Sequence, residues 1–340
     1  HTHWFPGGPA MDKKIRIGFI GCGGVSNGHA ERIIAMDDAE IVALCDTNQK
    51  TLDEYVERHP QLAGTPMFSD WKKMLDSVEL DAVEIHTPHT LHFEQIMTSL
   101  DLGLHVLCEK PMVCKSEDAL TVSRKLSETG LTLQVSYQRH FDPGFRHIRG
   151  MIADGVIGDV QFLTAWQSQE WKRITKGMWR QIPELSGGGQ LNDSGSHLVD
   201  IILWITGLAA DEVTAFIDNC GTPVDINSAV SVRFTNGAQG TINIIGDGIT
   251  FDEEITVFGT TGVLAIRGGK LTHTDNDGKV HELQPKSDST DPDRNFVDAI
   301  LGKDELQVPV ECGLRVIQLT EAAWKSAAEG KPSKVDHTEA

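Results

Sequence analysis

The chain has 340 residues, of which 39% are apolar, and its formal net charge at pH 7 is -19. This length and apolar content exclude a disordered chain or a miniprotein and allow two domains of ordinary size. The negative charge, with basic residues scattered along the chain, argues against nucleic acid as a partner, and no apolar run reaches the roughly 18 residues of a membrane span.

Six cysteines are widely spaced and include no Cys-x-x-Cys pair. This spacing favours free thiols in a reducing, cytoplasmic compartment. Residues 1–10 lack the apolar core of a secretory signal, so we interpret them as an irregular leader, disordered or left over from expression, ahead of Met11. They are excluded from the fold prediction.

The first part of the chain alternates short apolar strands with helices. The pattern predicts strands at 15–20, 41–45, 82–85, 105–108 and 132–136, and helices at 25–36, 49–58, 70–77, 90–102 and 116–129. Such alternation is typical of a parallel sheet covered on both faces. We therefore predict a doubly wound α/β domain over residues 11–136.

After this segment, strands follow one another without helices between them. A helix is predicted at 143–154, strands at 160–169, 213–218, 229–234, 238–245, 255–258, 263–267, 270–274 and 280–283, and closing helices at 294–301 and 312–329. Asn236-Gly237 and Asp277-Gly278 are hairpin signals. We predict a second α/β domain over residues 137–335 with a large, mostly antiparallel open sheet.

A glycine-rich turn follows the first predicted strand and consists of Gly21, Cys22, Gly23, Gly24, Val25 and Ser26. In a dinucleotide-binding turn the first glycine permits the tight turn, the second lets the backbone approach a pyrophosphate, and the third position must be small. Ser26 is nearly small enough, and the amides of the following helix would face the phosphates. The same pattern also occurs in ordinary strand-to-helix turns.

The second strand is followed by Asp46, which lies 20 residues beyond Ser26. At this spacing an acid can accept hydrogen bonds from both ribose hydroxyls of NAD. Asp46 would repel a 2'-phosphate, and neither Thr47 nor Asn48 supplies a cation to hold one. NAD is therefore favoured over NADP.

Three further motifs are Thr87-Pro88-His89 with His92, Glu109-Lys110-Pro111, and the run from Gly187-Gly188-Gly189 to Asp193, His197 and Asp200. Together with the glycine turn, these motifs resemble those of the glucose-fructose oxidoreductase and inositol dehydrogenase family, Gfo/Idh/MocA. The similarity runs in the same order along nearly the whole chain, from Lys13 to about Val335.

The resemblance implies an N-terminal Rossmann domain and a C-terminal domain whose open sheet forms the subunit contact of a homodimer or homotetramer. It implies that Lys110 points at the substrate near the nicotinamide, commonly with a cis bond before Pro111. It also implies that Thr87, His89, His92 and Glu109 line the cofactor cleft. Gln138 stands where Asn is common in the family, and we include it among the cofactor contacts.

Oxidation of a secondary alcohol needs a base for the hydroxyl proton as hydride leaves the carbon. We assign His197 as the acid/base, Lys110 as the ammonium that orients the hydroxyl, and Asp193 as a partner for a neighbouring hydroxyl. On a helix over 193–207, Asp193, His197 and Asp200 would share one face. The plainer interpretation has Asp193 as an N-cap and His197 as a core histidine, and for Asp200 a structural carboxylate is favoured.

A metal site is the rival hypothesis, because His86, His89 and His92 are spaced three residues apart. Pro88 interrupts a regular helix through them, and no His-Glu-x-x-His arrangement occurs. We therefore predict no catalytic metal.

Three tryptophans and two arginines precede the glycine run: Trp166, Trp171, Trp179, Arg173 and Arg180. Aromatic faces can stack on a sugar ring, and arginines can hydrogen-bond hydroxyls. Trp166, Arg173 and Trp179 are the predicted substrate contacts, although packing between domains would explain any of the tryptophans. Trp204 and Trp324 are expected to be core residues.

The sequence thus predicts an NAD-dependent oxidoreductase that moves hydride between nicotinamide and a carbon of a sugar, cyclitol or related polyol. Two alternatives share the resemblance. One is a glycosidase that uses NAD in a transient oxidation, and the other is a non-catalytic dinucleotide- or sugar-binding regulator. Retention of Lys110, Asp193 and His197 together argues against the regulator.

Overall fold

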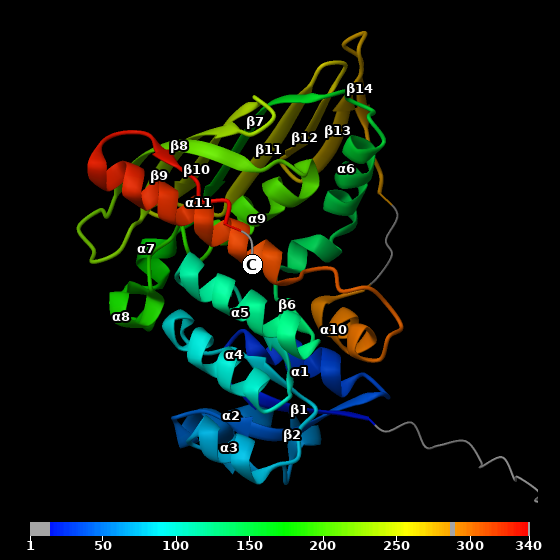
Figure 1. Ribbon diagram of the computed structural model, residues 1–340, viewed down its shortest axis with the longest axis vertical. Helices are drawn as coiled ribbons and strands as arrows, with labels where there is room; N and C mark the ends of the chain where they lie inside the picture. Colours follow the sequence, from blue (N-terminus) through cyan, green and yellow to red (C-terminus); the bar gives the residue numbers. More distant parts are fainter. Residues whose placement is uncertain (1–13, 286–289, 339–340) are drawn as a thin grey trace, which may run out of the picture.

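A six-stranded parallel sheet forms the N-terminal part of the computed structural model, which describes residues 14–285 and 290–338 (Figure 1). The predicted leader at 1–10 lies outside the described residues. The strands run in the order β3-β2-β1-β4-β5-β6 and are β1 Ile15–Ile20, β2 Ala39–Cys45, β3 Met67–Phe68, β4 Ala82–Ile85, β5 His105–Cys108 and β6 Leu133–Val135. The strand order reverses between β1 and β4, where doubly wound sheets bind ligands at the carboxyl ends of their strands.

Helices connect these strands as the sequence predicts. They are α1 Ser26–Ile34, α2 Gln49–Arg58, α3 Trp71–Ser77, α4 His92–Asp101 and α5 Ser116–Thr129, with 3-10 turns η1 Pro60–Leu62 and η2 His89–Leu91. Asp70 caps α3 by accepting a hydrogen bond from the backbone of Lys72. The prediction missed β3, whose two residues are too few for a sequence pattern.

A nine-stranded sheet forms the second half, in the order β14-β13-β12-β11-β7-β10-β9-β8-β15. Its strands are β7 Val160–Ser168, β8 Ala210–Asp218, β9 Asn227–Phe234, β10 Gln239–Ile245, β11 Asp252–Gly259, β12 Val263–Arg267, β13 Lys270–Thr274, β14 Val280–Glu282 and β15 Ser333–Lys334. All neighbours are antiparallel except β7 and β10. Both predicted hairpins are confirmed, with Gly237 and Gly278 at positive φ.

Helices cover one face of this sheet (Figure 1). They include α6 Pro143–Ala153, α9 Gly195–Thr206 and α11 Val310–Glu329; shorter elements are η3 Gln138–Phe141, α7 Trp171–Ile174, η4 Trp179–Gln181 and α8 Pro183–Ser186. Strand β9 alternates buried and exposed residues, as expected when only one face of a sheet is packed. The segment between β7 and the glycine run thus contains three short helical turns, α7, η4 and α8.

Helix α10, Pro292–Ile300, packs against α1. Its Phe296 and Val297 join the buried cluster of Ile17 and Phe19 in the parallel sheet. A part of the predicted second domain therefore contributes to the core of the first, while the division at 136/137 stays a prediction. In the part of the chain that the structure describes, no helix has the length and apolar character to cross a membrane.

Candidate active site

The glycine turn leaves open space next to its backbone. Gly21 has φ +95°, and a Cβ there would lie 2.9 Å from the carbonyl of His86, so this position requires glycine. A Cβ on Gly23 or Gly24 would meet nothing within 4 Å, which leaves room for a phosphate group beside the N-terminus of α1. Ser26 is fully buried and donates a hydrogen bond to the Gly23 carbonyl at 2.8 Å, so a small third residue is required.

Asp46 follows β2 and braces this turn. Its two carboxylate oxygens accept hydrogen bonds from the backbone N–H of Cys22 at 3.1 Å and of Asn48 at 3.0 Å. Thr47 and Asn48 are exposed beside it. The turn and the acid are therefore adjacent, as the spacing predicts, and the residues present fit the pyrophosphate and ribose of a dinucleotide.

The loops after β4 and β5 are tied together by His92. Its ring nitrogens lie 2.9 Å from the carbonyl oxygens of Thr87 and Pro111, and its side chain is fully buried. His92 therefore positions the two loops and does not itself line the cleft, which corrects that prediction. The Thr87 hydroxyl donates to Gln95 at 2.6 Å, the bond before Pro111 is cis, and Gln138 and Val25 are exposed.

A buried cluster of charged groups holds the backbone from which Lys110 projects. His29 on α1 contacts Asp293 at 2.7 Å and Glu109 at 3.0 Å, and Glu109 accepts a hydrogen bond from the Lys110 backbone N–H. Burial lowers the pKa of His29, but Asp293, Glu109 and Glu84 together raise it to about 10. His29 is therefore an imidazolium that pairs with the buried carboxylates of Glu109 and Asp293, and Asp293 also pairs with Arg32.

Glu84 and His86 complete this cluster. Burial and the nearby Asp293 raise the pKa of Glu84 well above its ordinary value. His29, Glu84 and His86 place their ligand atoms close enough together for a metal ion, as do His140, Asp200 and Cys312. His29 and His140, however, already bond carboxylates, and neither set contains Lys110 or His197. The predicted absence of a catalytic metal stays a prediction.

Lys110 and Asp193 meet although 83 residues separate them. The Lys110 ammonium lies 2.8 Å from one Asp193 oxygen, and Trp171 Nε1 and Arg180 Nε donate to the other at 2.7 and 3.0 Å. Burial would raise the pKa of Asp193, but Lys110, His89 and Arg180 outweigh it and hold the pKa well below its usual range. Asp193 is therefore an anion at neutral pH.

His197 lines the same cavity as Lys110 and Asp193. This cavity of about 310 Å³ is also lined by Trp171 and Arg180. Burial lowers the pKa of His197 well below 6.5, and the charge of Lys110 lowers it further. Among the described residues no hydrogen bond involves its ring, so the neutral imidazole is free to accept a proton.

Two of the predicted substrate contacts lie elsewhere. Trp166 is paired across β10, β9 and β8 in one row with Phe216, whose side chain is 80% exposed on the open face of the sheet. Its neighbours in β7, Ala165 and Gln167, are buried on the opposite face. Because side chains alternate along a strand, Trp166 faces away from the cavity.

Arg173 is also displaced from the cavity. Its side chain is 70% exposed and pairs with Glu170 on the surface. Trp171 and Arg180, from the same tryptophan- and arginine-rich segment, take the places predicted for Trp166 and Arg173. The alternation of the predicted strand at 160–169 was the signal that could have excluded Trp166.

Trp179 remains close to the site through His89. Its ring lies edge-on to that of His89 at 4.7 Å, and His89 Nε2 lies 3.5 Å from Asp193. His89 also bonds the carbonyl of Ser186 at 3.0 Å. Trp179 and His89 thus pack behind the carboxylate of Asp193.

Helix α9 begins at Gly195, so Asp193 lies in the turn before it and not on the predicted helical face. Asp200 instead contacts His140 at 2.6 Å and Arg315 at 3.4 Å and is fully buried. The structural interpretation of Asp200 is confirmed.

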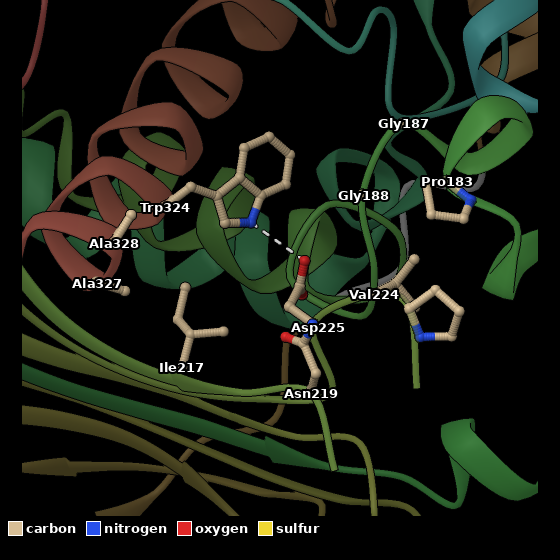
Figure 2. Close-up of a pocket in the computed structure, with 11 residues that line it drawn as sticks. Pro183, Gly187, Gly188, Ile217, Asn219, Val224, Asp225, Trp324, Ala327 and Ala328 are labelled. Atoms are coloured by element: carbon tan, nitrogen blue, oxygen red, sulfur yellow. Dashed lines mark hydrogen bonds between the residues drawn. The ribbon is translucent and has the colours of Figure 1, made fainter. Parts of the chain in front are cut away.

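Asp225 anchors the glycine run that leads to Asp193 (Figure 2). Its carboxylate accepts hydrogen bonds from the backbone of Gly189 at 2.9 Å and of Leu191 at 2.8 Å, and from Trp324 Nε1 at 3.1 Å. A Cβ on Gly189 would lie 2.0 Å from the Asp225 carbonyl oxygen, and one on Gly188 would lie 2.6 Å from the Trp324 ring. The glycines are therefore required by close packing.

Two family models match the chain. Residues 15–137 match the oxidoreductase family with an NAD-binding Rossmann fold, and residues 145–265 match the GFO/IDH/MocA C-terminal domain. Together these segments cover more than half of the sequence.

Individual proteins match over nearly the full chain. A myo-inositol 2-dehydrogenase of Thermotoga maritima is 27% identical, covering 95% of this chain and 99% of its own. A D-glucoside 3-dehydrogenase of Escherichia coli is 26% identical, covering 93% and 96%. The crystal structure of the WlbA dehydrogenase from Bordetella pertussis, in complex with NADH and UDP-GlcNAcA, is 25% identical with a TM-score of 0.83, covering 97% and 100%.

Proposed function

Because the chain belongs to the GFO/IDH/MocA family of oxidoreductases, we propose that it moves hydride between NAD and a secondary alcohol or ketone carbon of a sugar or cyclitol. The supporting observation is the ion pair of Lys110 and Asp193, at 2.8 Å, in one cavity with His197. The inositol and glucoside dehydrogenases among its relatives support the class of substrate.

Each of the three side chains has a separate task. Neutral His197 accepts the hydroxyl proton of the alcohol during oxidation and returns it during reduction. The Lys110 ammonium donates a hydrogen bond to the same oxygen and stabilises its developing negative charge. Asp193, anionic and held by Trp171 and Arg180, fixes Lys110 and accepts a hydrogen bond from a neighbouring substrate hydroxyl.

Bound NAD supplies the hydride acceptor, and the residues around Gly21 and Asp46 would hold it. Neither Thr47 nor Asn48, the two residues that follow Asp46, is a lysine or arginine, and the charge of Asp46 disfavours a 2'-phosphate. We therefore propose NAD as the preferred cofactor over NADP.

The test is an assay of NADH absorbance with NAD or NADP and a panel that includes myo-inositol, glucose and a methyl glucoside. Activity with NAD on at least one of them is expected, and Lys110→Met should lower kcat/KM at least about a hundredfold. Lys176→Met, an exposed lysine in the neighbouring segment, is the matched control. Cleavage of a chromogenic glycoside without net NADH would instead indicate the glycosidase, and full activity of Lys110→Met would refute the mechanism.

The open face of the nine-stranded sheet is the proposed self-association surface. Phe216 is 80% exposed and shares its row with Trp166. Light scattering should give a dimer or tetramer for the native protein and a smaller species for Phe216→Glu. Leu102→Glu, at an exposed apolar residue that ends α4 in the first domain, should leave the mass unchanged. A monomeric native protein would contradict this proposal.

A further inference from the structure

A second cavity, of about 590 Å³, is separate from the cavity of Lys110 and His197. One face of α6, the side chain of Trp204 on α9, the segment 305–312 and the first turns of α11 form its walls. Its charged lining residues are Arg146, Arg149, Arg315, Glu305 and Glu311. The two cavities share no lining residue.

Two of the arginines present buried N–H groups without an acceptor. Arg146 Nη1 and Arg315 Nε are both inaccessible to solvent, and neither has a hydrogen-bond partner within 14–285 and 290–338. Among the described residues, Arg315 makes a long contact of 3.4 Å with Asp200 and a weak one to the Cys312 sulfur. Buried polar groups are almost always paired, so unpartnered guanidinium N–H groups indicate a missing acceptor.

The third arginine is held in place by an aromatic ring. The Arg149 guanidinium lies 4.3 Å from the centre of the Trp204 ring, a cation–π arrangement. Burial lowers the pKa of Arg149, and the charge of Arg315 lowers it further, so the cations repel one another across the cavity. Glu305 and Glu311 line the rim but form no ion pair with these arginines within the described residues.

We propose that this cavity binds a small, multiply charged oxyanion, either a phosphate compound or a polycarboxylate. Guanidinium groups recognise the paired oxygens of phosphate and carboxylate through parallel N–H donors. The cavity volume lies in the range of small-molecule sites. An anion there pairs with the guanidinium groups of Arg146, Arg149 and Arg315 where they line the cavity, and it offsets the mutual repulsion of these cations.

Isothermal titration calorimetry of the full chain tests the proposal, with inorganic phosphate and citrate as separate probes at constant ionic strength. Saturable binding of at least one probe is expected, and the probe that binds identifies the oxyanion class. Arg146→Gln should weaken binding at least tenfold, and Arg149→Gln should do the same. Neither arginine has an ion pair among the described residues, so both variants should keep the native fold.

Arg233→Gln is the matched control, because Arg233 is an exposed arginine on β9, outside the cavity, that pairs with Glu212. It should bind the probe as the native protein does. The same probe should raise the midpoint of thermal unfolding of the native protein and of Arg233→Gln, but not of Arg146→Gln. Absence of binding by both probes, or binding that Arg146→Gln leaves unchanged, would overturn the proposal.

Discussion

Replacing His29 by glutamine should remove the buried cation on which the loop of Lys110 depends. His29 is 1% exposed and contacts Asp293 at 2.7 Å and Glu109 at 3.0 Å. Glutamine retains hydrogen-bonding capacity but not the charge, so one buried carboxylate loses its counter-ion. Breaking a buried ion pair in this way typically costs about 3–5 kcal/mol.

The structure also gives the pH dependence of this loss. The folded pKa of His29, about 10, lies above its unfolded value of 6.5. Its stabilisation is therefore fully present below pH 6.5 and is lost as the pH rises to about 10. In this window the slope is about 1.4 kcal/mol per pH unit, so at pH 7.5, about 2.5 units below the folded pKa, His29 contributes about 3 kcal/mol.

Urea unfolding of the native protein and of His29→Gln, between pH 7.5 and 9.5, measures this difference. The gap in unfolding free energy should shrink by about 1.4 kcal/mol per pH unit. The cysteines also have raised pKa values, but their titration affects the stability of both proteins equally and cancels in the difference. His59→Gln is the control. Because burial lowers the pKa of His59, the difference in unfolding free energy between the native protein and His59→Gln should stay constant above neutral pH. A constant gap for His29→Gln would refute the assignment of His29 as an imidazolium.

Three further outcomes are expected. Asp46→Ser should weaken NAD binding by roughly tenfold or more and reduce the preference for NAD over NADP, because a charged acceptor of the ribose hydroxyls is lost. Fluorescence titration with NADH and NADPH measures both affinities, and an unchanged preference for NAD would contradict the prediction. Gly189→Ala should destabilise the protein by about 2 kcal/mol or more, because the new Cβ overlaps the Asp225 carbonyl. Gly150→Ala, in a helix with open space around it, should stabilise the protein by about 0.5–1 kcal/mol. Calorimetric melting compares the two variants, and equal midpoints of thermal unfolding would count against the packing argument. In the residual activity of Lys110→Met, the acidic limb of the kcat/KM profile for alcohol oxidation should move to higher pH, because loss of the ammonium raises the pKa of His197; an unmoved limb would exclude His197 as the base.

Local patterns were sufficient to predict the architecture. Hydrophobic periodicity predicted the succession of strands and longer helices along the chain, because the period of apolar residues reflects the geometry of each element. The glycine turn and Asp46 were identified by spacing alone, since both follow neighbouring parallel strands whose carboxyl ends meet. Elements of two residues, such as β3 and β15, were missed because they depend on a neighbouring strand for their hydrogen bonds.

Side-chain partners from distant segments were decided by the tertiary structure. Trp171 and Arg180, on the short turns α7 and η4, hold Asp193. Trp166 points to the open face of the sheet because of its position in β7. Nothing near His29 in the sequence indicates that it bonds Asp293, 264 residues away.

The sequence by itself therefore determined the two sheets, the dinucleotide turn and the residue types needed for alcohol oxidation. Only the tertiary structure decided which of several tryptophans and arginines face Asp193, and which buried groups carry charge. The physical reason is that a local pattern records the periodicity of one element, whereas orientation and pKa depend on burial and on charges that packing brings together.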